Sequence, residues 1–249
     1  VSLNITVLEP SANIIYDPVN LILTRGEVME PAIPDTDGGA IEEWGIHPML
    51  PDGLVFDNGT IYGTPTVNMT ITNYIIYGNN SGGTSIAGLS ITVLEPAPTI
   101  TYLTEYLVLT RGETMTSPLH ATFGGGAVAS FTVTPELPDG LNLTNGIIFG
   151  TPTVNSTIVQ YNISAINNGG SDYFLLNITI REPVANLSAE QTYFELTRVE
   201  NEMNLTLNNT GGMVATWEIA PELPAGLIFG NGTITGTPTV NASLATYTI

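Results

Sequence analysis

Residues 50–66 read LPDGLVFDNGTIYGTPT, and this stretch decides the fold because it occurs three times in the chain. It returns as LPDGLNLTNGIIFGTPT at residues 137–153 and as LPAGLIFGNGTITGTPT at residues 223–239. The copies begin at residues 50, 137 and 223, so the period is 86 or 87 residues. Self-similarity at a fixed period is the signature of a tandem array, and we therefore predict an array of similar units.

Each unit is predicted to be all-β. The Asn58-Gly59 pair inside the repeated stretch is a strong signal for a tight hairpin turn. Residues 1–7 alternate apolar and polar side chains, and residues 87–93 and 174–180 repeat the pattern. Such alternation is typical of a strand with one buried face and one wet face. A unit of this length with several short strands fits an immunoglobulin-like sandwich.

The three copies of the repeated stretch resemble the cadherin-like, bacterial Ig-like tandem repeats of prokaryotic cell-surface proteins. The strings NNSGG at residues 79–83 and NNGGS at residues 167–171 share this resemblance. It covers essentially the whole chain. It implies tandem Ig-like sandwiches outside the cell that act as spacers or adhesive modules, and it implies no catalytic residues.

Recurring Glu-Pro pairs, at Glu9, Glu95 and Glu182, mark the predicted joints between units. We predict that residues 1–10 are the final strand of a preceding repeat or a donor strand. Residues 11–96 and 97–183 are predicted to be Ig-like repeats 1 and 2. Residues 184–249 are predicted to be repeat 3, lacking its final strand.

Two interpretations stay open for the extra strand at residues 1–10 and the final strand that repeat 3 lacks. In one, the sequence is a window on a longer array. In the other, residues 1–7 of one copy complete the third repeat of another copy by donor-strand exchange, in which main-chain hydrogen bonds and alternate side chains set the register. The predicted donor side chains are Val1, Leu3, Ile5 and Val7. The partners are accordingly copies of the chain itself or adjoining repeats of a longer one.

The chain carries 23 Asp and Glu residues against four Arg and no Lys, for a formal net charge of −19. Binding to nucleic acid requires basic side chains that displace counterions, so we exclude nucleic acid as a partner. The lack of cysteine excludes disulfides, thiol catalysis and cysteine zinc sites. No run of about 18 apolar residues is present, so we expect no direct membrane insertion in this segment.

We predict no enzymatic activity. The only histidines, His47 and His120, stand at different places in their repeats, and the sequence has no nucleophile elbow, phosphate loop or paired-histidine metal motif. The adjacent carboxylates Glu42 and Glu43 are better explained as solvated side chains than as a glycosidase pair.

Sequons for N-linked glycosylation are abundant, and glycans are the partner chemistry that the sequence supports best. The alternative is that Asn and Thr simply suit turns and exposed strands. The predicted sites are Asn4, Asn58, Asn68, Asn79, Asn142, Asn155, Asn162, Asn177, Asn186, Asn204, Asn208, Asn231 and Asn241.

Calcium is the one cofactor that the sequence raises. Asp35 and Asp37, with Glu42 nearby, look like half of a carboxylate loop, although the corresponding loops of the other repeats have no aspartate. The joint glutamates are a second candidate for a cation. Solvated acids are the alternative explanation at both places, and the one that we favour.

Three of the four arginines, Arg25, Arg111 and Arg198, follow a threonine at the same place in each repeat. We predict that each anchors a carboxylate or backbone carbonyls within its own unit. The sequence as a whole predicts a structural part of a glycosylated extracellular filament, surface layer or stalk on an archaeal or bacterial surface. The alternative is an adhesin stalk or binding module for carbohydrate or protein ligands.

Overall fold

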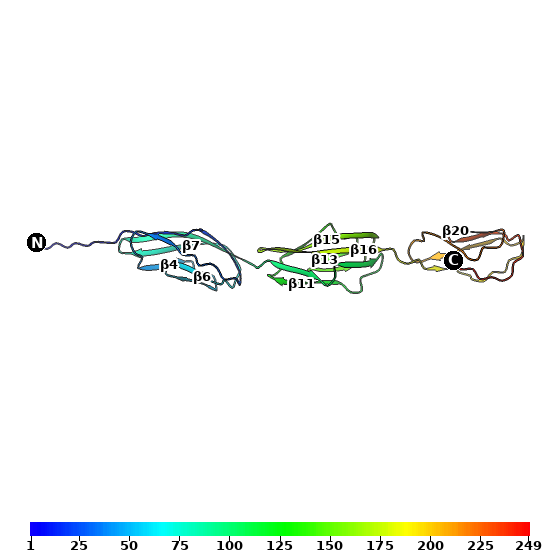
Figure 1. Ribbon diagram of the computed structural model, residues 1–249, viewed down its shortest axis with the longest axis horizontal. Helices are drawn as coiled ribbons and strands as arrows, with labels where there is room; N and C mark the ends of the chain where they lie inside the picture. The colour runs from blue at the N-terminus through cyan, green and yellow to red at the C-terminus, as the bar shows by residue number, and fades with distance from the viewer.

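The computed structural model describes all 249 residues, and they form three β-structured bodies in a row with an extended N-terminal segment (Figure 1). All 21 regular elements are strands, which confirms the predicted all-β fold. No helix in the structure has the length and apolar character needed to cross a membrane.

The first body contains eight strands. They are β1 (Asn13–Ile15), β2 (Asn20–Thr24), β3 (Asp35–Asp37), β4 (Glu43–His47), β5 (Leu54–Asp57), β6 (Thr60–Gly63), β7 (Met69–Asn80) and β8 (Gly83–Leu94). One sheet has the order β2-β8-β7-β4, and the pairs β1-β3 and β5-β6 supply the other layer. Ten buried residues from both layers, Ile14, Ile61 and Ile91 among them, form one core.

The second body repeats this architecture. Its strands are β9 (Pro98–Tyr102), β10 (Tyr106–Thr110), β11 (Leu119–Gly125), β12 (Ser130–Thr134), β13 (Leu141–Thr144), β14 (Ile147–Gly150), β15 (Ser156–Asn167) and β16 (Gly170–Arg181). Two four-stranded sheets, β10-β16-β15-β12 and β13-β14-β11-β9, enclose a second core of ten residues. A sandwich of two sheets, each burying one face, is the arrangement that the alternating strands predicted.

The last strand of each of these bodies lies inside its sheet. Strand β8 pairs parallel with β2 on one side and antiparallel with β7 on the other, and β16 does the same with β10 and β15. Because side chains alternate along a strand, Leu89, Ile91 and Val93 all point into the core and are at most 3% exposed. The edge strands β2 and β10 therefore depend on this strand for their only pairing within the sheet, whereas β7 and β15 also pair with β4 and β12.

The third body is built differently. Its strands are β17 (Leu187–Ser188), β18 (Met203–Thr206), β19 (Asn208–Asn209), β20 (Leu227–Gly230) and β21 (Thr233–Gly236). The sheet β18-β21-β20 and the pair β17-β19 correspond to the second sheet of the second body. Residues 193–197, which correspond to β10, form no strand, and residues 242–249, which correspond to β15, form only the single bridge Ala220↔Thr248.

The core of the third body is correspondingly small. Met203 and Ile234 are its only buried large hydrophobic residues, whereas each of the other bodies has a cluster of ten. Hydrophobic burial is the dominant favourable contribution to folding, and within residues 1–249 this contribution is smallest in the third body.

A turn of the third body carries an additional strain. Val199 has a φ of 64°, at the place where the other bodies have Gly26 at 82° and Gly112 at 79°. The three residues are equivalent because each N–H donates to a proline carbonyl, of Pro238 for Val199, at 2.8 or 2.9 Å. A β-branched residue at positive φ is a strained outlier.

We expect Val199→Gly to stabilise the third body. Release of the strain gains roughly 1–3 kcal/mol, and the freedom of Gly in the unfolded chain returns roughly 0.4–1, so the net gain is about 1 kcal/mol. Denaturant unfolding followed by Trp217 fluorescence, with Trp44 replaced by Phe, measures it. The matched change Gly26→Val, followed by Trp44 fluorescence with Trp217 replaced by Phe, should cost a similar amount by conformation alone, because a Cβ there meets no atom within 4 Å. Equal unfolding midpoints for the Val199→Gly variant and the unchanged chain would contradict this account.

Candidate functional site at the joints between bodies

The joint between the first and second bodies is the segment Glu95-Pro96-Ala97, which connects β8 to β9. Strands β2 and β8 are parallel and in register, with Thr24 opposite Leu94. The next residue of each strand, Arg25 and Glu95, therefore leaves the sheet on the same side. The Arg25 N–H extends the ladder by donating to the Leu94 carbonyl at 2.8 Å.

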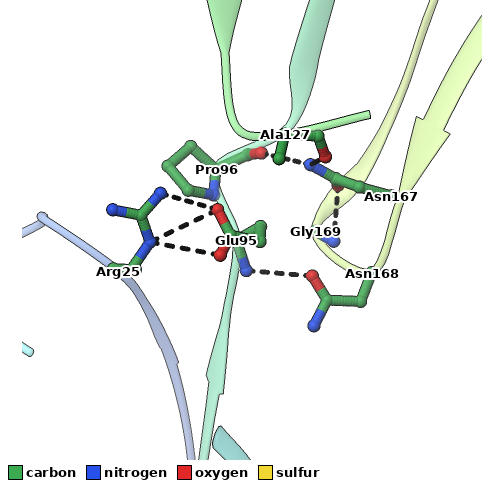
Figure 2. A network of polar contacts seen from close by, with 7 residues as sticks. All are labelled: Arg25, Glu95, Pro96, Ala127, Asn167, Asn168 and Gly169. Atoms are coloured by element: carbon green, nitrogen blue, oxygen red, sulfur yellow. Dashed lines mark hydrogen bonds and ion pairs between the residues drawn. The ribbon is translucent and has the colours of Figure 1, made fainter. Parts of the chain in front are cut away.

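The side chains of Arg25 and Glu95 form a forked ion pair (Figure 2). Arg25 Nη2 lies 2.7 Å from Glu95 Oε2, and Arg25 Nε donates to both carboxylate oxygens at 3.2 and 3.3 Å. The hydrogen bond from Arg25 lowers the pKa of Glu95 against the opposing effect of burial, and the pKa of Arg25 is raised in turn by Glu95. The prediction that Arg25 anchors a carboxylate is thus confirmed.

The second body holds the same segment from its other side. Asn167 ends β15 and Asn168 begins the turn to β16, and the Asn168 Oδ1 accepts a hydrogen bond from the Glu95 N–H at 3.0 Å. Asn167 Nδ2 donates to the Pro96 carbonyl at 2.7 Å and to the Ala127 carbonyl at 3.2 Å (Figure 2). The side chain of Glu95 is therefore bound to the first body and its backbone to the second.

Two glycines permit this close approach. A Cβ on Gly169 would lie 1.7 Å from the Glu95 carbonyl oxygen, and a Cβ on Gly126 would lie 2.2 Å from that of Pro96. Both distances are far inside contact with backbone atoms, so any larger residue must displace the joint. Gly169 is also held by its own turn, since its N–H donates to Asn167 Oδ1 at 2.8 Å.

The same joint recurs along the chain. Arg111 pairs with Glu182 in the same fork, with Nη2 2.6 Å from Oε2. At the N-terminal side of the first body, Asn80 Nδ2 donates to the Pro10 carbonyl at 2.8 Å, and Ser81 Oγ accepts from the Glu9 N–H at 3.0 Å. The molecule thus contains one complete joint and several halves of the same design.

The joint glutamate is less exposed where both bodies contact it than where only one does. The Glu95 side chain is 14% exposed, whereas that of Glu182, which receives no Asn turn from the third body, is 34% exposed. The structure contains only these two ion pairs, so Arg198 and Glu9 take part in none. These two residues occupy the Arg25 and Glu95 places of a joint.

The carboxylates of the predicted calcium loop are not brought together. Asp35 and Asp37 are exposed on β3, and Asp37 Oδ1 accepts a hydrogen bond from the Gly38 N–H at 2.8 Å. No group of three or more His, Asp or Glu side chains is placed to hold a metal ion, so Glu42 does not complete a site with them. At the joints, the cationic partner of Glu95 and Glu182 is an arginine.

The predicted glycosylation sites differ in accessibility. Most of the sequon asparagines are exposed, whereas Asn79, Asn162 and Asn177 are half-buried on long strands. The amide of Asn79 donates to Glu43 Oε2 at 3.1 Å, and that of Asn177 donates to the Glu105 carbonyl at 3.2 Å. These three side chains are therefore the least available for modification.

The role of the Asn-rich turn was not predicted from the sequence. The strings NNSGG and NNGGS recur in the sequence, and this recurrence is the available signal. What they contact lies about 70 residues away, since Asn80 bonds Pro10 and Asn167 bonds Pro96.

No protein-family model matches the sequence, and no curated protein matches it. Among solved structures, the chain is similar to the N-terminal four Ig domains of Dscam1 isoform 9.44, at 12% identity and a TM-score of 0.44, over 70% of this chain and 47% of that one. It is similar to human protocadherin-24 EC1-2 at 13% identity and a TM-score of 0.33, over 71% and 98%. It is also similar to a titin Ig tandem at 14% identity and a TM-score of 0.30, over 70% and 97%. The chain spans about half the length of the Dscam1 fragment.

We expect Gly169→Ala to loosen the joint between the first two bodies without unfolding either, because the new methyl group collides with the Glu95 carbonyl. Spin labels on cysteines introduced into the two bodies report the distance distribution between them, which should broaden. Gly88→Ala is the matched control, since a Cβ there has no neighbour within 4 Å. An unchanged distribution in the Gly169 variant would show that the turn does not set the joint.

The same labels test the pH dependence of the joint. The pKa of Glu95 is lowered in the folded chain by Arg25, so its contribution is complete above the unfolded-state pKa of about 4.3 and is lost as pH falls through the lower folded-state value. The distribution should therefore stay narrow at neutral pH and broaden only below about pH 4. Glu95→Gln should remove this transition, whereas Glu113→Gln should leave it intact. A transition that survives in the Glu95 variant would assign it to another group.

Proposed function

We propose that this chain is a non-enzymatic structural element of an extracellular filament, surface layer or stalk, in which sandwiches are held end to end. The observation that carries the proposal is the joint. Only three residues separate β8 from β9, and both the side chain and the backbone of Glu95 are bonded, each to a different body. A linker this short, with its polar groups bonded on both sides, transmits orientation from one body to the next.

The form of the molecule agrees with a spacer. The bodies follow one another along a single axis (Figure 1), so each unit adds length without adding width. Units that contact only their neighbours are the basis of extended repeat proteins. The mechanism is therefore separation and cohesion, with no chemical step assigned to any residue.

The surface supports the same proposal. A net charge of −19 makes neighbouring rods repel one another, which favours solubility and opposes unspecific lateral association. Glycans on the exposed sequons would cover part of the sheet edges, and edges left open are a hazard for aggregation. Strands β2 and β4 are such edges in the first body.

Native material from the source surface tests this function. Electron microscopy should show filaments, layers or stalks, and mass spectrometry of their peptides should find glycans at exposed sequons such as Asn68, Asn155 and Asn241. Asn79, Asn162 and Asn177 should be unoccupied and serve as internal controls. The absence of any such assembly, together with specific binding of the chain on a glycan array, would favour the adhesin module instead. Uniformly unmodified sequons would remove glycosylation from the proposal.

A further inference from the structure

The N-terminal segment presents a strand that has no partner in the molecule. Residues 1–10 are extended and form no sheet (Figure 1). Leu3, Ile5 and Val7 are 80%, 76% and 90% exposed, whereas the residues at the same repeat positions in β8 are at most 3% exposed. The segment thus has the apolar face of an inner strand and exposes it to water.

The third body presents the complementary arrangement. Residues 193–197 and 242–249 correspond to β10 and β15, the two strands that flank β16 in the second body. Neither segment has a ladder of its own, and Phe194, Leu196 and Tyr247 along them are only half-buried. Apart from the bridge between Thr248 and Ala220, neither segment has a strand partner, and an extended peptide can add main-chain hydrogen bonds along such an edge.

The register between them follows from the two joined bodies. In the first body Asn20 lies opposite Ser90 and Thr24 opposite Leu94, in parallel. The same register places Tyr193 opposite Asn4 and Thr197 opposite Leu8. In the second body Asn162 lies opposite Leu175, antiparallel, which places Thr248 opposite Ser2.

The charges agree with this register. Arg25 and Arg111 each pair with the glutamate that ends the adjacent strand, and the equivalent of that glutamate in residues 1–10 is Glu9. Arg198 and Glu9 are the one arginine and the one glutamate at these positions without an ion pair. Glu9 and Pro10 are already held on the first body by Ser81 and Asn80. The contacts between the first body and the Glu9-Pro10 segment are therefore already in place before residues 1–8 bind to a second copy.

We propose that residues 1–8 of one copy insert between residues 193–197 and 242–249 of a second copy, with Glu9 pairing with Arg198. The inference rests on the proposed function and specifies its self-association. The segment and the third body lie at opposite ends of the row (Figure 1), so the contact is head to tail. A heterologous contact of this kind that does not close on itself generates an open filament.

Cysteine cross-linking tests the register, because the chain has no cysteine of its own. The variant Ser2→Cys with Thr248→Cys should give a ladder of disulfide-linked oligomers on a non-reducing gel. The control Ser2→Cys with Ser243→Cys moves the second thiol five residues along the segment and should give little or none. Monomer alone from the first variant, or equal ladders from both, would overturn the proposal.

Sedimentation of the full chain tests the contributions of the apolar face and of the Glu9–Arg198 ion pair to association. Ile5→Asp should abolish oligomers, whereas Thr6→Asp, with the same charge on the opposite face, should preserve them. Arg198→Glu and Glu9→Arg should each weaken association by roughly tenfold or more, and the double variant should restore it. Oligomers that persist in the Ile5 variant would overturn the proposal.

These experiments separate the inference from the function on which it rests. Ile5 contacts no body, so its replacement leaves the monomer a straight rod, as the distance distribution between the first two bodies would show. A straight monomer that never associates would overturn the strand exchange alone. A flexible monomer would overturn the spacer function, whether or not it associates.

Discussion

The structure depends on one strand being placed between two others that precede it in the sequence. Strands β8 and β16 are the last of their bodies, yet each lies second in a four-stranded sheet. Ile91, Val93 and Ile178 are fully buried there, and burial of one such side chain is worth roughly 1.5–3 kcal/mol. Without this strand the edge strand β2 or β10 has no partner, and the sheet is reduced to the pair on its other side. The contrast between the second and third bodies illustrates this constraint.

The position of the same strand also determines the geometry of the joints. Because β8 runs parallel to β2, their C-terminal ends coincide, and Arg25 meets Glu95 where the chain leaves the sandwich. An exposed ion pair contributes little on its own. Its effect here is to fix the side chain of a residue whose backbone is bonded to the next body, so that two sandwiches share one short segment.

Each of the two ion pairs gives a joint carboxylate a positive partner within an otherwise acidic chain. Each carboxylate at a joint needs a positive partner as it becomes partly covered by the next body. Arg25 and Arg111 supply that partner from the same chain, directly after the neighbouring strands β2 and β10. The few cations of the chain are thus concentrated where neighbouring bodies meet, and the remaining surface is left strongly negative.

The sequence by itself determined the period and the all-β fold, and it predicted the anchoring that Arg25 and Arg111 show and Arg198 does not. Turn chemistry at Asn58-Gly59 and the alternation of residues 87–93 are local, so they can be read without coordinates. Tertiary structure alone decided the partners. Glu95 is 70 residues from Arg25, and only parallel pairing brings them together. Asp35 and Asp37 are within seven residues of Glu42 in sequence, yet the three are not placed together as a metal site, because spacing along a chain does not fix side-chain directions. Repetition indicates which residues matter, and the pairing of strands decides what they touch.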